Sequence, residues 1–292
     1  MMTGVLLASL AAGVAGVLAR MRTARAAHRS AARTVSITCP SPSLDGSLPA
    51  EVYLPAGYSG HGRRYPVVYF LHGLPAGPQS YTNNGFVAAA LQAAHEPAIV
   101  VAPQGARSTN SDREYLDWSP QENWPAAISR DLTTCIDSRY HTIADRTGRA
   151  LMGLSAGGYG AANVGLHNLS QFAAVESWSG YFEATDPSGD HILDLGSPAE
   201  QEAATVPHGP RLRRRLAVWP TFIGFYVGRQ DSRFFKMNEQ FDAALRRTGI
   251  THTFAVYPGG HQYSLWQSHA RQWLTMALDY LAARHRHPHS RG

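Results

Sequence analysis

The sequence contains few cysteines, almost no lysine and no apolar run long enough to cross a bilayer. Its two cysteines, Cys39 and Cys135, either form one bridge or remain unpaired small apolar side chains, so they do not decide the cellular compartment. Of 26 basic residues only Lys236 is a lysine, and the formal net charge of +5 comes with no recognisable nucleic-acid-binding module. The composition therefore gives no support for a nucleic-acid partner.

The longest uncharged apolar run covers residues 4–19. As a helix it would be about 24 Å long, which is short of the roughly 30 Å needed to span a bilayer upright. It is closer to the core of a signal peptide, and Ala24-Arg25-Ala26 offers an A-x-A cleavage pattern. Positive charge follows this run instead of preceding it, which leaves an uncleaved anchor or a true start at Met21 open. We expect residues 1–33 to be a leader for a secreted or cell-envelope protein, membrane-associated if the apolar segment is retained, and a cytoplasmic protein if the chain starts at Met21.

The rest of the chain is predicted to be one domain with a short tail. No internal repeat and no Pro- or Ser-rich linker divides it, and a chain that is 44% apolar can bury a substantial core. We assign residues 34–284 to the domain and residues 285–292 to a polar tail. The tail histidines, His285, His287 and His289, alternate with basic residues and indicate solvated side chains rather than a metal site. No metal or organic cofactor is expected.

Strand-like and helix-like segments alternate through the domain. Short apolar runs predict strands at residues 50–54, 65–71, 97–102, 149–153, 172–178, 222–227 and 251–257. Helical patterns lie at residues 85–94, 124–140, 156–168, 235–248 and 263–283. This alternation predicts an α/β fold, a mostly parallel sheet with helices on both faces. Residues 34–38 and 50–54 are separated by a turn-rich segment and are expected to form an antiparallel edge.

The stretch Gly153-Leu154-Ser155-Ala156-Gly157 fits the G-x-S-x-G nucleophile elbow. It follows a predicted buried strand and opens a predicted helix, which is the context that an elbow requires. A serine on such a sharp turn has its oxygen thrust out of the backbone, and glycines two positions away on either side avoid clashes. Ser155 is therefore the candidate nucleophile.

A candidate base and acid follow in the chain. His261 lies in a glycine-rich loop after the predicted strand 251–257, and Asp231 follows the predicted strand 222–227 in a Gly-x-x-Asp sequence. The order Ser155, Asp231, His261 is that of the α/β-hydrolases and differs from the chymotrypsin and subtilisin orders. Asp231 would hold the imidazole in the correct tautomer, although an aspartate here could instead only cap the next helix. Asp242 is the main rival acid, but it lies inside a helical pattern.

The loop after the predicted strand 65–71 carries the candidate oxyanion donor. In this fold that loop offers one backbone N–H and the residue after the nucleophile offers another. We assign Leu74 and Ala156, with Gly73 as the alternative to Leu74, whereas Pro75 has no N–H to donate. His72 is interpreted as a structural hydrogen-bonding residue under the loop rather than a second base.

A polar segment at residues 182–216 has no clear periodicity and separates two predicted strands. Its position predicts a lid or cap over the active-site rim. It contains a short arginine run at residues 211–215, which is typical of a solvated face and could also attract an anionic surface or substrate. Tyr115, Trp118 and Trp124 either line the pocket or belong to the core.

The pieces "VYLPAGY", "YPVVYFLHG", "GLSAGGYGA", "VGRQDSRF" and "YPGGHQYSLW" resemble the putative esterase family, the esterase D and mycolyltransferase-like α/β-hydrolases. This family includes S-formylglutathione hydrolases, feruloyl and acetyl esterases and mycobacterial acyltransferases. The resemblance runs from about Thr34 to Ala283 and implies an α/β-hydrolase fold with a triad and oxyanion donors at the residues assigned above. The mycolyltransferases of the family carry an acidic residue at the position of His72, an arginine at that of Pro75 and a glutamate at that of Asp231, so a trehalose-specific site is not expected.

These residues predict a serine carboxylic-ester hydrolase that acts through an acyl-enzyme on a small-molecule, lipid or polysaccharide ester. Two alternatives stay open. One is an acyltransferase that moves the acyl group to a sugar or lipid alcohol, and the other is a non-catalytic binding protein on a hydrolase scaffold. The sequence indicates neither the acyl length, the alcohol group nor the oligomeric state.

Overall fold

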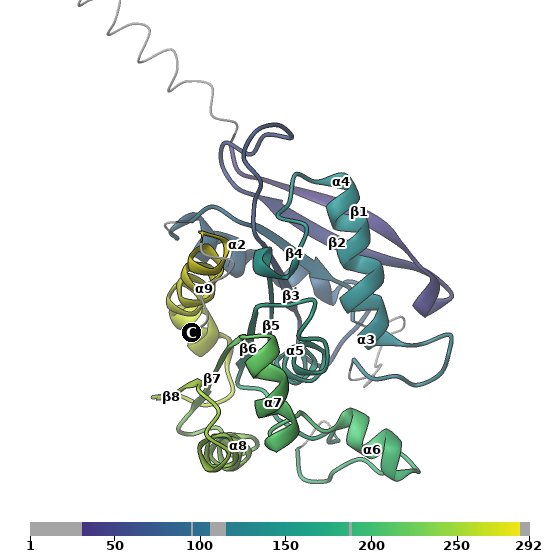
Figure 1. Cartoon of the computed structure of the whole chain (residues 1–292), viewed down its shortest axis with the longest axis vertical. Coiled ribbons are helices and arrows are strands. Elements are labelled where there is room, and N and C mark those ends of the chain that lie inside the picture. The colour runs from purple at the N-terminus through teal and green to yellow at the C-terminus, as the bar shows by residue number, and fades with distance from the viewer. Residues whose placement is uncertain (1–30, 95, 106–114, 187–188, 287–292) are drawn as a thin grey trace, which may run out of the picture.

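The computed structural model describes residues 31–94, 96–105, 115–186 and 189–286, and one eight-stranded sheet runs through them (Figure 1). The strand order is β1-β2-β4-β3-β5-β6-β7-β8. Strands β4, β3, β5, β6, β7 and β8 are parallel to one another, whereas β2 pairs antiparallel with both β4 and β1 and forms an antiparallel edge with β1. The expected mostly parallel sheet with an antiparallel edge is confirmed. The strands are β1 (Arg33–Ser41), β2 (Gly46–Leu54), β3 (Val67–Leu71), β4 (Ile99–Pro103), β5 (Arg149–Leu154), β6 (Ala174–Trp178), β7 (Phe222–Gly228) and β8 (Thr253–Tyr257).

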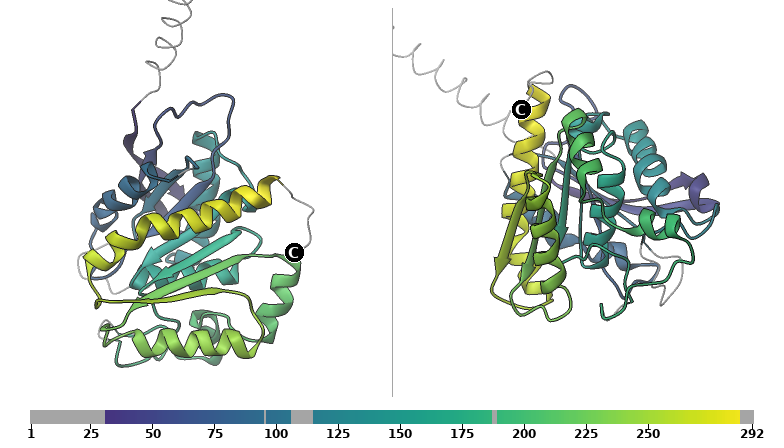
Figure 2. Two further views of the ribbon diagram at one scale, coloured as in Figure 1. Left: turned by 90° about the vertical axis from the view of Figure 1, so that its left-hand side faces the viewer. Right: turned by 60° about the horizontal axis from the view of Figure 1, so that its bottom comes forward.

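Helices cover both faces of this sheet (Figure 2). Helices α2 and α9 pack against each other on one face, and α4, α5 and α8 contribute to the core of the other. The helices are α2 (Gly85–Gln92), α3 (Trp124–Ala126), α4 (Thr133–Arg139), α5 (Ala156–His167), α6 (Pro198–Ala204), α7 (Pro210–Val218), α8 (Phe235–Arg247) and α9 (Tyr263–Arg286).

Strand β3 illustrates why helices cover both faces of the sheet. All five of its residues are buried, and their side chains alternate between the two cores. Tyr69 and Leu71 pack on the α5 side, and Val68 and Phe70 pack on the α9 side. A continuous apolar strand of this kind is stable only where helices shield both faces from water.

Two segments differ from the sequence prediction. Residues 124–140, predicted as one helix, contain a π-helical segment (Ala127–Leu132) between α3 and α4. The polar segment 182–216 contains α6 and the start of α7, although no periodicity predicted helices there. Both helices are short, and residues at their N-termini favour helix formation. Each helix has a proline in its first turn, and Ser197 caps α6 by accepting from the Glu200 amide at 3.2 Å.

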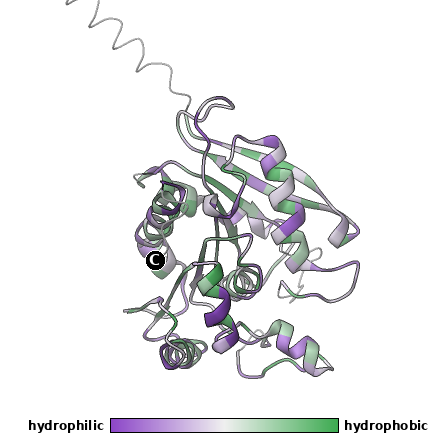
Figure 3. Ribbon diagram, in the orientation of Figure 1, coloured by the Kyte–Doolittle hydropathy of each residue, from purple (hydrophilic) through white to green (hydrophobic). Residues whose placement is uncertain are grey.

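The arginine run lies in α7, which is strongly hydrophilic over that stretch (Figure 3). The Arg215 guanidinium donates to the carbonyl oxygens of Leu166 and His167 at 3.0 and 2.8 Å, at the end of α5. A cation there satisfies orphan carbonyls and complements the helix dipole. Arg211 forms an exposed ion pair with Glu202 at 3.2 Å. At least these two arginines therefore have structural partners.

Cys39 on β1 and Cys135 on α4 form a disulfide, with their Cα atoms 5.8 Å apart. The sequence left this pairing open. Within the described ranges, none of the helices is both long enough and apolar enough to cross a bilayer. The predicted leader, apart from residues 31–33, and tail residues 287–292 lie outside the described residues, while the exposed His285 belongs to the last turn of α9.

Candidate active site

Ser155 stands on the turn between β5 and α5, with φ 55° and ψ −124°. Positive φ is uncommon for a residue other than glycine and marks a strained position of the kind found at functional sites. The flanking glycines are sterically required. A Cβ at Gly153 would lie 2.2 Å from the Gly157 oxygen, and a Cβ at Gly157 would lie 2.1 Å from the Leu71 oxygen. The predicted strand–turn–helix context of Ser155 is thus present.

Three side chains from distant parts of the chain form a hydrogen-bonded line. The Ser155 Oγ lies 2.9 Å from the Nε2 of His261, and the His261 Nδ1 lies 2.7 Å from the Oδ2 of Asp231. Ser155 is 7% exposed and Asp231 1%. Because Nδ1–H can donate only to the carboxylate, Nε2 is left to accept the proton of the serine hydroxyl. The structure thus brings together the three side chains that the sequence predicted.

Asp231 has two structural tasks, one for each carboxylate oxygen. Its Oδ2 faces His261, and its Oδ1 accepts from the backbone amides of Arg233 and Phe234, both at 3.2 Å. Asp231 is not the N-cap of α8, which is Phe234; its two amide bonds lie in the turn that leads into α8 and fix the carboxylate orientation. Asp242, the rival acid, instead pairs with His252 at 2.8 Å and with Arg246 at 2.9 Å.

Two aromatic rings pack against the imidazole of His261. The centroids of Phe234 and Trp266 lie 5.2 and 5.0 Å from the imidazole centroid, both in edge-to-face geometry. The Trp266 indole is itself held, because its Nε1–H donates to the Ser179 Oγ at 3.0 Å. These edge-to-face contacts restrict rotation of the imidazole. No sequence pattern predicted this packing, although Trp266 stands only five residues after the histidine.

Two backbone amides flank Ser155. The Ala156 amide opens α5, where the first N–H groups of a helix have no intrahelical acceptor and the dipole is positive. The loop after β3 passes close by, since a Cβ at Gly73 would lie 2.9 Å from the Ser155 Cβ. Among the described residues, no hydrogen-bond acceptor is found for the amide of Leu74 or of Ala156. The assignment of these two amides as oxyanion donors stays a prediction.

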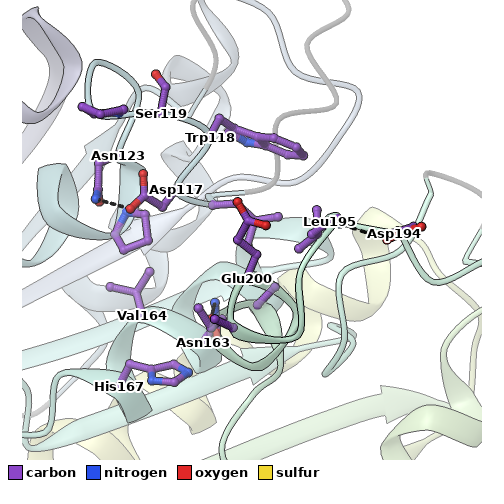
Figure 4. Close-up of a pocket in the computed structure, with 17 residues that line it drawn as sticks. Asp117, Trp118, Ser119, Asn123, Asn163, Val164, His167, Asp194, Leu195 and Glu200 are labelled. Carbon is purple, nitrogen blue, oxygen red and sulfur yellow. Dashed lines mark hydrogen bonds between the residues drawn. The ribbon is translucent and has the colours of Figure 1, made fainter.

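A cavity of about 1040 Å³ lies along the flank of α5 (Figure 4). It lies between the 116–125 loop, α5 and α6, and Trp118 lines it, whereas Tyr115 and Trp124 are buried in the core. Its first residue on α5 is Asn163, about 12 Å along the helix from Ser155 at 1.5 Å per residue. The Tyr159 hydroxyl donates to the Ala204 carbonyl oxygen and ties α6 to the same flank. These contacts place α6 beside α5, so the predicted lid over the active-site rim stays a prediction.

Glu176 on β6 is a fully buried carboxyl group. Its Oε2 accepts from the Trp178 Nε1 at 2.9 Å, and burial raises its pKa well above the ordinary value. No sequence motif marks this residue. No group of three or more His, Cys, Asp or Glu side chains that could hold a metal ion is found in the described part of the chain.

A protein-family model described as "Putative esterase" matches residues 41–273. Esterase Rv1288 of Mycobacterium tuberculosis (strain ATCC 25618 / H37Rv) is 26% identical over 238 residues, which cover 73% of this chain and 52% of that protein. The same figures hold for Esterase MT1326 of the strain CDC 1551 / Oshkosh. The chain thus spans about half the length of the curated relatives it matches.

Solved structures agree on the fold. A ferulic acid esterase superposes with a TM-score of 0.71 at 24% identity, over 86% of this chain and 99% of that one. An S-formylglutathione hydrolase from Agrobacterium tumefaciens gives a TM-score of 0.69 at 19% identity, over 86% of this chain and 96% of that one. The predicted α/β-hydrolase fold is confirmed.

Proposed function

Because this chain belongs to the putative esterase family, we propose that it is a serine carboxylic-ester hydrolase with Ser155 as nucleophile, His261 as base and Asp231 as acid. The observation that carries the proposal is the continuous line from the Ser155 Oγ through His261 to Asp231, at 2.9 and 2.7 Å. A nucleophile within hydrogen-bond reach of a base that a third group orients is the arrangement that acyl transfer requires.

The proposed reaction has two halves. The Ser155 Oγ attacks the ester carbonyl carbon while its proton moves to the His261 Nε2, and the carbonyl oxygen becomes an oxyanion between the Leu74 and Ala156 amides. The C–O bond to the alcohol then breaks, and the alcohol leaves with the proton from His261. Water attacks the acyl-enzyme with His261 again as base, which releases the acid and restores the serine.

The test is hydrolysis of nitrophenyl acetate by the wild type, by Ser155→Ala and by Ser268→Ala, a matched change at an exposed serine on α9. We expect Ser155→Ala to lose on the order of 10⁴-fold or more in kcat and Ser268→Ala to match the wild type. Equal rates for wild type and Ser155→Ala would refute the assignment of the nucleophile.

The substrate class follows from a panel of nitrophenyl esters from acetate to palmitate, with feruloyl and S-formyl substrates added because the structural relatives are a ferulic acid esterase and an S-formylglutathione hydrolase. Product analysis with sugar and lipid alcohols present separates hydrolysis from acyl transfer. Free acid as the sole acyl product supports hydrolysis, and acylated acceptor in excess of free acid contradicts it.

We also infer that the protein is exported. The disulfide between Cys39 and Cys135 supports this, because disulfides persist in oxidising compartments and are rare in the cytosol. The signal-like apolar run at residues 4–19 agrees with it. Acid-quenched cells treated with a thiol-reactive polyethylene glycol should show no mass shift without prior reduction. Addition of two polyethylene glycol groups in unreduced samples would mean that both cysteines are free thiols, and it would contradict export.

A further inference from the structure

The buried imidazole of His72 makes a hydrogen bond with each of its nitrogens at the end of β3. The Gly105 amide donates to the His72 Nε2 at 2.9 Å, and the His72 Nδ1 lies 3.0 Å from the Gly73 carbonyl oxygen. A backbone N–H can only donate, so Nε2 is unprotonated and the proton of the neutral ring is on Nδ1. That proton is donated to the Gly73 carbonyl oxygen. Burial, with the side chain 5% exposed, lowers the pKa of His72 and keeps the ring neutral.

This hydrogen bond fixes the direction of the next amide. In a trans peptide unit the C=O and the following N–H point in opposite directions, and the Gly73–Leu74 bond is trans. Because the His72 ring holds the Gly73 carbonyl on the buried side, the Leu74 N–H is directed away from the ring. The same peptide unit lies beside the nucleophile, as the 2.9 Å between a Cβ at Gly73 and the Ser155 Cβ demonstrates.

A second clamp holds the preceding peptide unit. The Tyr115 hydroxyl donates to the His72 carbonyl oxygen at 2.8 Å. Tyr115 is 2% exposed, and its hydroxyl would lie 2.4 Å from a Cβ at Gly105, so it packs tightly against one partner of the His72 ring. Two successive carbonyl groups of the loop are thus held by buried side-chain donors, and no rotation of either peptide is possible without breaking one of these bonds.

We propose that His72 is a positioning residue of the oxyanion hole: its neutral, Nδ1-protonated ring holds the Gly73 carbonyl so that the Leu74 amide faces the oxyanion formed on Ser155. This proposal rests on the proposed esterase function. It assigns to His72 an effect on the transition state, which a residue that only supports the fold would not have. The loss of one oxyanion donor typically costs 10²–10³-fold in kcat.

Two substitutions distinguish the hydrogen bond of the His72 Nδ1 from that of the His72 Nε2. In His72→Asn the amide nitrogen takes the place of Nδ1 and can still donate to Gly73, but nothing replaces Nε2. In His72→Gln the amide reaches the place of Nε2 and can accept from Gly105, but no donor remains for Gly73. We expect kcat for nitrophenyl acetate to fall less than about tenfold in His72→Asn and on the order of 10²–10³-fold in His72→Gln, with KM changed less than about threefold in both.

A transition-state analogue supplies the second readout. A trifluoromethyl ketone that forms an oxyanion adduct with Ser155 should lose affinity in His72→Gln by the same factor as kcat/KM, while the affinity for the product acid stays within about threefold. Tyr115→Phe, which removes only the hydroxyl that holds the His72 carbonyl, should lose kcat/KM and analogue affinity together, by a smaller factor. Tyr115→Phe decides the question if His72→Gln does not fold.

The proposal is overturned if folded His72→Gln keeps kcat within threefold of the wild type, or if the Asn and Gln variants lose kcat equally. It is also overturned if analogue affinity in Tyr115→Phe is unchanged while its activity falls. Ser155→Ala in the same assay keeps this failure distinct from failure of the proposed function. An inactive Ser155→Ala beside an unaffected His72→Gln removes only the role of His72, whereas an active Ser155→Ala removes the esterase mechanism itself.

Discussion

Replacing Asp231 with asparagine tests the hydrogen-bonded line by changing one atom. The Oδ1 of Asp231 accepts from the amides of Arg233 and Phe234. An asparagine must therefore place its carbonyl oxygen there, because its NH₂ group would face two donors. The NH₂ group then points at the Nδ1 of His261 and donates to it. The imidazole is forced to carry its proton on Nε2, which faces the Ser155 hydroxyl and can no longer accept its proton.

The expected loss follows from this wrong tautomer. The equivalent change in the serine-protease template lowers kcat about 10⁴-fold with the geometry intact, which corresponds to about 5 kcal/mol of barrier. Steady-state hydrolysis of nitrophenyl acetate measures it. We expect urea denaturation of Asp231→Asn to differ little from the wild type, because the carbonyl oxygen keeps both backbone bonds.

Asp242→Asn is the matched control. It removes one carboxylate charge beside another histidine, His252, which lies 2.8 Å from Asp242. Its kcat should equal that of the wild type. The reasoning is refuted if Asp231→Asn keeps more than about a tenth of wild-type kcat. It is equally refuted if Asp231→Asn lowers the residual rate of Ser155→Ala further, because residues that act as one unit are not additive.

Three further predictions concern stability. The Cys39→Ser/Cys135→Ser double variant should lose up to about 4.7 kcal/mol of unfolding free energy in urea. This is the chain-entropy value for a loop of about 100 residues, and the two cysteines are 96 positions apart. An unchanged urea midpoint would count against the bridge. Gly157→Ala should lose about 1–3 kcal/mol or more of unfolding free energy, because its Cβ would meet the Leu71 oxygen at 2.1 Å. The control Gly85→Ala, whose Cβ would meet nothing within 4 Å, should change the unfolding free energy by less than about 1 kcal/mol. Equal effects of the two substitutions would contradict the packing. For Glu176, burial raises the pKa well above its ordinary value of 4.5, so above that pH the unfolded chain releases a proton that the folded protein keeps, and stability falls as pH rises. Glu176→Gln should therefore have the same unfolding free energy in urea as the wild type near pH 4 and a higher one at pH 8. The control Glu239→Gln, at an exposed position, should show no such pH-dependent difference. A difference between Glu176→Gln and the wild type that is the same at both pH values would disprove buried protonation of Glu176.

Much of the site could be predicted because each part has a local sequence signal. Gly153 and Gly157 mark the elbow, since a Cβ at either position would overlap backbone atoms. Asp231 and His261 each follow an apolar strand, and the carboxyl ends of parallel strands meet at one edge of the sheet. The positions of the strands along the chain and the position of the nucleophile therefore follow from short segments read alone.

The parts that could not be predicted depend on contacts between distant segments. The role of the His72 ring is set by Gly105 and Tyr115, which lie 33 and 43 positions away. The pairing of Cys39 with Cys135 likewise depends on β1 lying beside α4. Helix α6 did carry a local signal, the cap at Ser197 with Glu200 three residues later, but a cap produces no hydrophobic periodicity.

Covalent labelling with a fluorophosphonate tests the central claim most directly, because the probe reacts only with a serine that a neighbouring base has activated. Mass spectrometry of the labelled, digested protein should find one adduct, on the peptide that contains Ser155, and no adduct in Ser155→Ala. The same adduct should form far more slowly in Asp231→Asn. An unlabelled wild-type protein, or an adduct at another residue that persists in Ser155→Ala, would contradict the account.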